Sequence, residues 1–507
     1  MHRVSQSSIR IIMNSSIRSL GSDTIVYAIG TFLLRAVSIV LIPIYTSALA
    51  VQEYGAVETL MVLVQTLRIL LTFGLSSAIL RFYPECKNEN EEMTMVRTSL
   101  VITLGLSLMS LMLIIPFSSH LGGILFKNEG YRQYIVLAFL LAVGNSIQLL
   151  LLSYYRARQA SGIYVIFSII YFLILVTTNI VLVSFLGLGI LGILLGNLIV
   201  IISGDVLLAF RFWRNGVSIS FDWAKKLSVF SFPLIFSMIS WLILNSADRF
   251  FLSYYKDLNE VGLYALGYKV GLIVNLGVIV PFQLAWAPYV FNNFDADKKE
   301  ILIKSYSRIF TYLILCYSIL GLSVLFFSKE IIFFLGSGKY SQSVQVVPYV
   351  IIAYVFVGVF YWAGVFFYLV KKTILLSVIV SSMALLNLIF NWVMIPVWGG
   401  IGAAITTVVT MSGTGLLTLI IGRRFLSIPL EGVRLIKLVL GLLFVSLLYS
   451  FLPSNILSNF VIRIILVPIF LIFLVIVKFF TQTEYKYFVT FLLSMPKILS
   501  LKKKHAN

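Results

Sequence analysis

The chain has 507 residues, of which 60% are apolar and 11% are charged. Soluble proteins average about 45–50% apolar and about 25% charged residues, so a soluble enzyme, a disordered chain and a secreted disulfide-rich domain are excluded. The 38 basic and 19 acidic residues give a net charge of +19. In a membrane protein this excess is typical of cytoplasmic loops, and we therefore expect no nucleic-acid partner. The composition predicts a chain that crosses a membrane many times.

Apolar runs bounded by charged residues, Gly or Pro predict an all-α membrane protein with about fourteen transmembrane helices, because about 20 apolar residues cross a bilayer as a helix. The predicted spans are 22–46, 57–80, 97–117, 133–154, 162–185, 188–210, 227–251, 261–285, 306–327, 346–370, 373–395, 401–421, 435–452 and 461–480. The loops between them are short. Any function must therefore reside within the helical bundle.

Basic residues are divided unevenly between the loops on the two sides of the membrane. Nineteen Lys and Arg residues lie on the side of the N-terminus and seven on the other side. The positive-inside rule then places both termini in the cytoplasm. The tail from Tyr485 to Lys504 carries five Lys residues. It either lies on the anionic inner leaflet or is a free basic end, and both interpretations stay open.

Short similarities recur six spans apart. Glu53–Val57 resembles Glu260–Tyr264, and Gly189–Gly192 resembles Gly399–Gly402. An even number of spans in each unit predicts two parallel six-helix lobes around a central cavity, plus two C-terminal helices. The predicted organisation is a cytoplasmic N-terminal segment (1–21), an N-lobe (22–210), a cytoplasmic linker (211–226), a C-lobe (227–422), spans thirteen and fourteen (423–480) and a basic cytoplasmic tail (481–507).

Two arginines fall inside the first two spans. Arg35 lies about 13 residues into span one and Arg68 about 11 residues into span two, so both lie near the middle of the bilayer at 1.5 Å per residue. An uncompensated Arg at this depth costs about 2.5–3.5 kcal/mol. The carboxylates on the same helices, Asp23 and Glu58, lie about 18 Å and about 15 Å away along the helix axes. Either neutral polar groups of other helices satisfy the two arginines, or an anionic substrate does, since a guanidinium group binds phosphate bidentately.

Further charged candidates lie at the ends of spans. Arg81, at the cytoplasmic end of span two, is a candidate first contact for the substrate or an ordinary cytoplasmic charge. Asp248 and Arg249 lie near the outer end of span seven, and Lys269 lies about two turns into span eight. An Asp248–Lys269 ion pair would leave Arg249 free to bind substrate, and Asp248 is also a candidate coupling residue. Asp205, near the cytoplasmic end of span six, is expected to pair or cap locally.

Neutral amides within spans are further candidates for substrate binding, because they suit sugar hydroxyl groups, although hydrogen bonding between helices is the alternative. The candidates are Asn145, Asn179 and Asn387. The sequence contains no nucleotide-binding loop of the G-x-x-x-x-G-K type. It also contains no His/Cys/Asp/Glu cluster with the spacing of a metal site. We therefore expect no metal and no cofactor.

Three segments carry a family resemblance. Gly74–Glu85 at the end of span two, Asn245–Leu252 in span seven and Glu260–Ala265 in span eight are similar to the corresponding stretches of polysaccharide biosynthesis proteins. These are the Wzx-type O-antigen and capsule flippases of the multidrug/oligosaccharidyl-lipid/polysaccharide (MOP) exporter superfamily. The resemblance covers essentially the whole chain and implies two lobes in a V shape with two additional C-terminal helices.

The resemblance also implies a function. A cationic cavity would carry undecaprenyl-diphosphate-linked oligosaccharide from the inner to the outer leaflet of the bacterial inner membrane, with polysaccharide polymerase and chain-length machinery and membrane lipid as partners. Arg35 and Arg68, with Arg249 or Lys269, would bind the diphosphate and the glycan. One alternative is a cation-coupled small-molecule exporter of the same superfamily, which would need acidic residues in its cavity. The other is a membrane-embedded glycan polymerase or ligase, which would need a large periplasmic loop.

Overall fold

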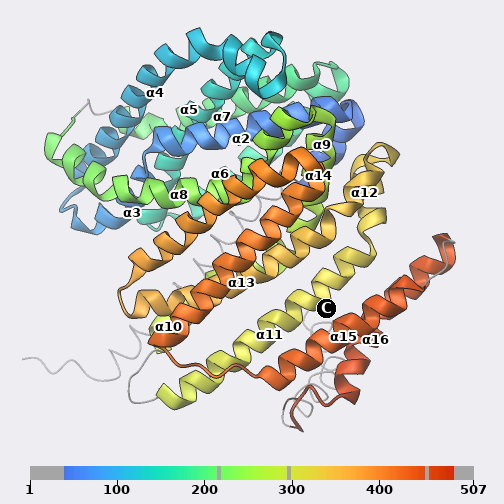
Figure 1. Cartoon of the computed structure of the whole chain (residues 1–507). Coiled ribbons are helices and arrows are strands. Elements are labelled where there is room, and N and C mark those ends of the chain that lie inside the picture. Colours follow the sequence, from blue (N-terminus) through green and yellow to red (C-terminus); the bar gives the residue numbers. More distant parts are fainter. Residues whose placement is uncertain (1–38, 214–217, 294–298, 452–455, 483, 485–507) are drawn as a thin grey trace, which may run out of the picture. The chain divides into compact units, whose positions relative to one another are not determined.

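Helices make up all the regular structure of the described part of the chain, which comprises residues 39–213, 218–293, 299–451, 456–482 and 484 of a computed structural model (Figure 1). The all-α prediction is confirmed. Arg35 lies outside the described residues. The basic tail after residue 484 lies outside them as well.

The chain first forms seven helices that correspond to the first six predicted spans. They are Ile39–Ala48, α2 (Val51–Thr72), α3 (Leu75–Phe82), α4 (Glu89–Phe126), α5 (Arg132–Ala157), α6 (Ser161–Asn179), which continues as a π-helical segment (Ile180–Phe185), and α7 (Gly189–Trp213). The first residues of α2 illustrate how these helices begin: the Glu53 carboxylate accepts a hydrogen bond from the backbone N–H of Ala50 (2.9 Å). This satisfies one of the free N–H groups of the first turn.

The remaining helices follow in chain order. They are α8 (Phe221–Tyr255), α9 (Leu258–Val274), a π-helical segment (Asn275–Ile279), α10 (Val280–Asn293), α11 (Lys299–Phe326), α12 (Ser328–Gly336), a 3₁₀ segment (Gly338–Gln345), α13 (Val347–Leu369), α14 (Thr373–Phe425), α15 (Gly432–Ser450) and α16 (Ile456–Ile476). The Ser220 hydroxyl caps α8 by accepting from the Trp223 N–H (3.4 Å).

The helices reproduce the predicted number of spans. Eleven described stretches are long and apolar enough to cross a membrane, and two shorter apolar helices, Ile39–Ala48 and Ile462–Ile476, match the first and last predicted spans. The 53-residue α14 covers two predicted spans, because its backbone leaves the helical conformation at Gly399 (φ 55°, ψ −133°). Glycine adopts a positive φ without a steric penalty. With α14 counted twice, the fourteen predicted spans are accounted for.

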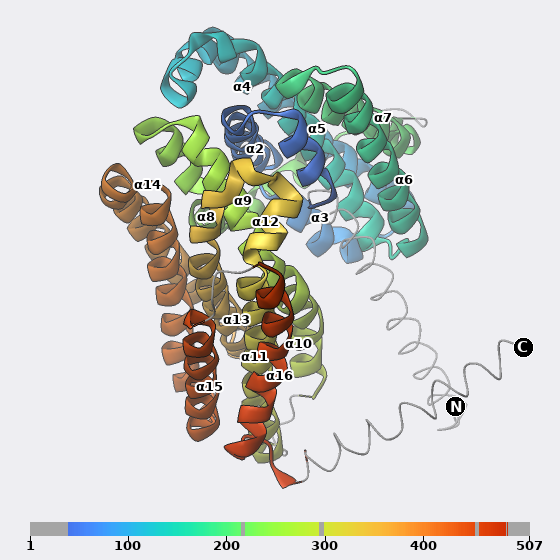
Figure 2. The ribbon, with the colours of Figure 1, turned by 90° about the vertical axis from the view of Figure 1, so that its right-hand side faces the viewer.

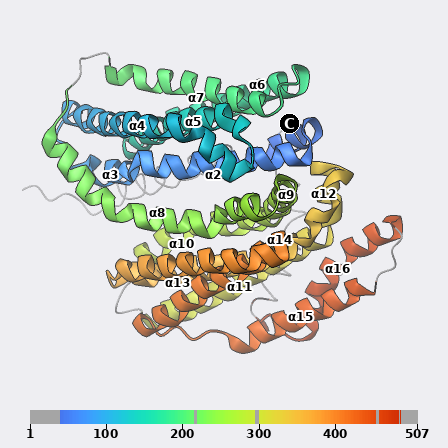
Figure 3. The ribbon, with the colours of Figure 1, turned by 45° about the horizontal axis from the view of Figure 1, so that its top comes forward.

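The chain forms two compact units. One consists of the described residues within Met1–Leu272 and Lys329–Ile420, and the other of those within Ile273–Ser328 and Ile421–Asn507. In the first unit α6 packs against α7 (Figure 2), and α2 lies between α5 and α8 (Figure 3). In the second unit α15 and α16 pack against each other and against α11. The predicted lobes, 22–210 and 227–422, stay a prediction.

Buried aromatic residues form the centre of each unit. In the first unit, the rings of Tyr154 and Phe212 meet edge to face at 5.1 Å within a cluster of buried aliphatic side chains. In the second unit, Phe326 and Phe470 lie in a cluster that joins α11, α15 and α16. These contacts fix the helices that carry the polar residues described below.

The N-terminal ends of α2 and α9 meet in a reciprocal contact. A Cβ atom at Gly55 would lie 1.8 Å from the Leu258 carbonyl oxygen, and one at Gly262 would lie 2.4 Å from the Val51 carbonyl oxygen. Both pairs of equivalent residues, Gly55 with Gly262 and Val51 with Leu258, have the spacing of the predicted repeat. Only glycine allows the two backbones to approach so closely. The contact therefore has the two-fold character that the repeat predicts.

Candidate functional site

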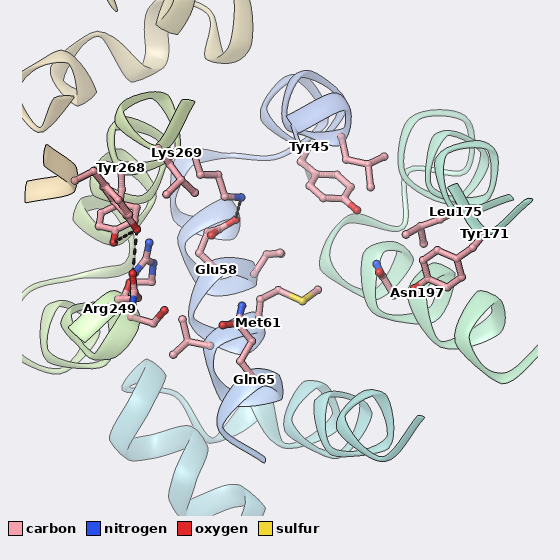
Figure 4. Close-up of a pocket in the computed structure, with 17 residues that line it drawn as sticks. Tyr45, Glu58, Met61, Gln65, Tyr171, Leu175, Asn197, Arg249, Tyr268 and Lys269 are labelled. Carbon is pink, nitrogen blue, oxygen red and sulfur yellow. Dashed lines mark hydrogen bonds and ion pairs between the residues drawn. The ribbon is translucent and has the colours of Figure 1, made fainter. Parts of the chain in front are cut away.

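A polar pocket of about 480 Å³ lies within the first unit, and we call it the main pocket. The helix Ile39–Ala48, α2, α6, α7, α8, α9 and α13 all contribute side chains to it. Its polar lining residues are Tyr45, Glu58, Gln65, Tyr171, Asn197, Asn245, Ser246, Arg249, Tyr268, Lys269 and Tyr354. Figure 4 shows Arg249 and Tyr268 on one side of α2, and Tyr45, Tyr171 and Asn197 on the other.

A second pocket of about 560 Å³ adjoins the main pocket, because both are lined by Gln65, Asn245 and Ser246. We call it the arginine pocket, since Arg68 lines it. The Trp241 ring also lines this pocket and stacks on Tyr361 with a centroid distance of 6.2 Å. The two pockets together form a continuous polar region along α2.

One face of α2 supplies both pockets. Glu58, Gln65, Arg68 and Thr72 are spaced by seven, three and four residues and all line the polar region. Residues at these spacings lie on the same face of a helix. Glu58, Met61 and Gln65 follow one another along α2 in Figure 4. A polar stripe therefore runs along a helix that is otherwise apolar enough to span a membrane.

Arg68 has a guanidinium group without a counter-ion. Its Nε atom is enclosed by protein and has no hydrogen-bond partner, and Arg68 forms no ion pair within the described ranges. The hydroxyl group of Thr72, one turn further along α2, also lacks a partner. Buried polar groups without partners are rare in folded proteins. Arg68 lines the arginine pocket, so a guanidinium group without a counter-ion borders the space that an anion would enter.

Lys269 pairs with a carboxylate that the sequence did not suggest. Its Nζ atom lies 2.5 Å from Glu58 Oε1 and 3.1 Å from the Tyr54 hydroxyl oxygen. The Asp248–Lys269 ion pair, which the sequence left open, does not form. Asp248 instead accepts a hydrogen bond from the Tyr264 hydroxyl group, and Lys269 lies five residues, about 7.5 Å, further along α9.

Arg249 is also compensated, contrary to expectation. Its Nη1 atom lies 2.9 Å from Asp248 Oδ1 and donates to the Asn245 carbonyl oxygen at 2.9 Å. Its guanidinium carbon lies 4.6 Å from the centre of the Tyr268 ring, within the range of a cation–π contact. Both members of the Asp248–Arg249 pair are buried. Arg249 lines the main pocket, but Asp248 compensates its charge.

Arg81 lies outside both pockets. It is 56% exposed in its side chain and pairs with Glu85 at 3.0 Å, one turn further along the chain. Its guanidinium carbon also lies 5.3 Å from the centre of the Phe82 ring. Its role as a first contact for the substrate stays a prediction.

The three candidate amides are absent from the linings of both pockets. Asn145 donates to the carbonyl oxygen of Leu141 at 2.7 Å. Asn179 is fully buried and accepts a hydrogen bond from the Tyr45 hydroxyl group at 2.9 Å, which orients a ring of the main pocket. Asn387 donates to Thr410 Oγ1 at 3.1 Å. These contacts join helices or satisfy the backbone, and a direct role in substrate binding stays a prediction.

Glu58 and Gln65 line the main pocket but are not among the binding residues predicted from the sequence. The helical spacing of Glu58, Gln65, Arg68 and Thr72 was a usable signal, because it places four polar residues on one face of an apolar span. The tyrosines of the main pocket carried no such signal, since Tyr is common at membrane interfaces. Within the described residues, no three His, Cys, Asp or Glu side chains are grouped in a way that would hold a metal ion.

Comparisons with known proteins agree with this architecture. Residues 20–294 match the family described as polysaccharide biosynthesis protein, and residues 233–393 match the MatE family. No curated protein is a significant match in sequence.

Several solved structures share the fold at low sequence identity. The lipid II flippase MurJ in an inward closed conformation superposes with a TM-score of 0.68 at 14% identity, covering 89% of this chain and 98% of MurJ. An inward-facing multidrug resistance MATE family transporter of the MOP superfamily has a TM-score of 0.63 at 14% identity, covering 78% and 94%. A MOP superfamily transporter from Pyrococcus furiosus, whose binding pocket is described as having reverse polarity, has a TM-score of 0.57 at 14% identity, covering 81% and 95%.

The fold, the multiple spans and the polar pocket within them define a multi-pass membrane transporter of the MOP exporter superfamily. The family match covers more than half of the sequence. The chain belongs to the polysaccharide biosynthesis protein family, as the resemblance of its spans two, seven and eight predicted.

Proposed function

We propose that the protein is a flippase for undecaprenyl-diphosphate-linked oligosaccharide repeat units. It moves them from the inner to the outer leaflet of the bacterial plasma membrane for O-antigen, capsule or exopolysaccharide synthesis. Both termini lie in the cytoplasm. A polysaccharide polymerase and chain-length machinery take up the product on the outer side, and membrane lipid surrounds the polyprenyl tail.

The observation that carries this proposal is the state of Arg68. A guanidinium group lies in a transmembrane helix, borders a polar pocket and has no carboxylate partner among the described residues. Burying a charge without a partner is costly. A diphosphate group supplies two negative charges and accepts bidentate hydrogen bonds from a guanidinium group. Cargo that carries a diphosphate therefore offsets the cost of Arg68, and a neutral cargo does not.

The main pocket suits the glycan part of this cargo. Gln65, Asn197 and Asn245 line it with amide groups, which both donate and accept hydrogen bonds as sugar hydroxyl groups do. Trp241 and its stacked partner Tyr361 provide a flat apolar surface at the arginine pocket. We place the diphosphate at Arg68 and the first sugars between the amides of the main pocket.

Binding of the cargo and rearrangement of the protein are linked in this proposal. Lys269 and Arg249 already pair with Glu58 and Asp248, so in the present state the protein's own carboxylates neutralise the cations of the main pocket. The glycan part of the cargo, bound in the main pocket, competes with Glu58 for hydrogen bonds from Lys269 and thereby releases a contact between α2 and α9. A ligand shifts a conformational equilibrium only through such differences in its contacts between states. Arg35 is proposed to assist Arg68 from span one.

A second candidate function has specific support. The MatE family matches residues 233–393, and the carboxylate of Glu58 lines the main pocket. A cation-coupled exporter of small molecules uses acidic pocket residues, so a cationic substrate would pair with Glu58 in place of Lys269. The polymerase or ligase alternative describes an enzyme, whereas the fold is that of transporters.

The experiment that tests the proposal is a translocation assay in proteoliposomes. The liposomes contain fluorescent undecaprenyl-diphosphate-linked oligosaccharide, and a membrane-impermeant quencher reports which leaflet it occupies. We expect translocation by the wild-type protein, strong loss with Arg68→Ala, and wild-type rates with Arg158→Gln. Arg158 is the matched control, because it lies in the same unit and pairs with Glu89 at the protein surface. Transport of cationic dyes but not of the lipid-linked glycan would overturn the proposal in favour of the exporter.

A further inference from the structure

Three carboxylates are buried in the part of the chain that the structure describes, and one of them has no cationic partner. Glu58 pairs with Lys269 and Asp248 pairs with Arg249. Asp205, on α7, is 7% exposed and forms no ion pair within the described ranges. Its Oδ1 atom is enclosed by protein and has no hydrogen-bond partner. The expected local pairing or capping of Asp205 is therefore wrong for this oxygen.

Asp205 borders a third pocket, of about 500 Å³, which is separate from the polar region. The other lining residues are apolar and come from α4, α5 and α7. Ile147 of α5 lines this pocket, whereas Leu149 of the same helix lines the arginine pocket. Residues two apart point to opposite sides of a helix, so α5 lies between Asp205 and Arg68.

The groups around Asp205 are neutral. Gln148 of α5 lies beside the neighbouring Gly204, and its side-chain amide nitrogen also lacks a partner. Tyr171 of α6 is a titratable group within electrostatic reach of Asp205. Tyr155 of α5 donates to the carbonyl oxygen of Leu208, three residues further along α7, at 3.4 Å. No described charged side chain of α2, α4 or α5 lies close enough to interact with Asp205 electrostatically.

These surroundings identify the cation that Asp205 can bind. An ionised carboxylate that is buried without a partner costs several kcal/mol. A metal cation such as Ca²⁺ needs six or more oxygen ligands, and the apolar pocket wall supplies none. The ammonium group of a lipid could not reach the enclosed Oδ1 atom, so one oxygen of an ionised carboxylate would stay without a partner. A proton needs only the carboxylate itself.

We infer that Asp205 is a proton-binding site, and that the proton it holds is coupled to movement of the cargo. Tyr171 connects the two regions, because it lies near Asp205 and also lines the main pocket. Asn197, two turns earlier on α7 than Asp205, lines the main pocket too. Loss of the proton creates a charge that α7 cannot keep buried, so α7 and the pocket wall it forms must move. The coupling rests on the proposed flippase function, whereas proton binding does not.

Infrared spectroscopy of the purified protein tests proton binding directly. A protonated carboxyl group gives a carbonyl band that is separate from the carboxylate bands and shifts in D₂O. We expect this band at pH 7 in the wild-type protein and in Asp222→Asn, and its loss in Asp205→Asn. Asp222 is the matched control, since it lies exposed in the first turn of α8. Asn resembles the protonated acid in shape, so Asp205→Asn should fold with an unchanged melting temperature. A band that persists in Asp205→Asn, or is absent from the wild type, overturns the inference.

Translocation in proteoliposomes under an imposed pH gradient tests the coupling. We expect the wild-type rate to change several-fold when the gradient is reversed, and the rate of Asp205→Asn to be independent of the gradient. A gradient response that survives in Asp205→Asn overturns the coupling. If the wild type moves no lipid-linked oligosaccharide, the proposed function fails while the infrared band still establishes the proton site.

Discussion

Lys269 on α9 and Glu58 on α2 form an ion pair of 2.5 Å that borders the main pocket. The pair joins a helix from the first half of the sequence to a helix from the second half. It also gives Lys269 a carboxylate partner inside the main pocket, where the proposed function places the first sugars of the cargo. The same contact therefore stabilises the present arrangement of α2 and α9 and neutralises a cation that the cargo needs.

We predict that Glu58 and Lys269 are energetically coupled. Glu58→Gln and Lys269→Gln should each lower the melting temperature, because each leaves a partly buried charge without its partner. The double variant should lose less free energy of unfolding than the two single variants lose together, and the difference is a coupling free energy of about 0.5–3 kcal/mol. A double-mutant cycle in detergent measures this value. Additive effects would show that the pair contributes nothing to stability.

Neutralising the carboxylate of the Asp248–Arg249 pair should destabilise the protein more than neutralising that of the Glu58–Lys269 pair. The side chains of Asp248 and Arg249 are 3% and 7% exposed, compared with 10% and 23% for Glu58 and Lys269. Asp248→Asn leaves a guanidinium group buried without its counter-ion, and we expect a destabilisation of about 3–5 kcal/mol. Thermal unfolding of the two single variants, compared under the same conditions, checks the order. A smaller loss for Asp248→Asn than for Glu58→Gln would contradict the prediction.

The close approach of α2 and α9 predicts that Gly55 tolerates no side chain. Gly55→Ala puts a methyl group against the Leu258 carbonyl oxygen, and Gly262→Ala puts one against that of Val51. Each substitution should destabilise the protein by about 1–3 kcal/mol, as overpacking does. Gly105→Ala is the matched control, because a Cβ there has no neighbour within 4 Å. Equal melting temperatures for all three variants would show that the contact is not tight.

Labelling of Cys86 can show on which side of the membrane the loop after span two lies. Burial, together with the negative charges of Glu91, Glu92 and Glu85, raises the pKa of its thiol to about 11. The thiol is therefore protonated at neutral pH and should react slowly with maleimides, and its reaction should accelerate as the pH rises toward 10. In a Cys316→Ser background, an impermeant maleimide should label inside-out vesicles and not intact cells. Labelling of intact cells would place this loop, and the N-terminus, outside.

Hydrophobic patterning predicted the fold well because long apolar runs are a local property of the sequence. The two halves of α14 were separated correctly at the glycines near residue 399, where the backbone φ of 55° requires glycine. Gly189 has the same φ at the equivalent position of the repeat. The charge pairs were predicted poorly because they depend on which helices are neighbours. Glu58 and Lys269 lie 211 residues apart, and only the packing of α2 against α9 brings them together.

The partner of Arg249 was missed for a different reason. Adjacent residues of a helix do not usually face each other, so helical spacing does not indicate a pair between Asp248 and Arg249. The long Arg249 side chain nevertheless folds back to Asp248 and to the Asn245 carbonyl oxygen, because it is buried against the rings of Tyr264 and Tyr268. For Arg68, in contrast, the sequence predicts that Glu58 on the same helix is too far away to pair with it, and Arg68 forms no ion pair among the described residues.

The affinity of the purified protein for diphosphate-linked oligosaccharide lipid tests the role of Arg68 most directly. A charge-assisted hydrogen bond contributes about 1.5–3 kcal/mol, and about 1.4 kcal/mol corresponds to a tenfold change in the dissociation constant. We predict that Arg68→Gln weakens binding about tenfold or more, that Arg68→Lys recovers part of the loss, and that Arg158→Gln leaves the affinity unchanged. An unchanged dissociation constant for a correctly folded Arg68→Gln variant would contradict the account.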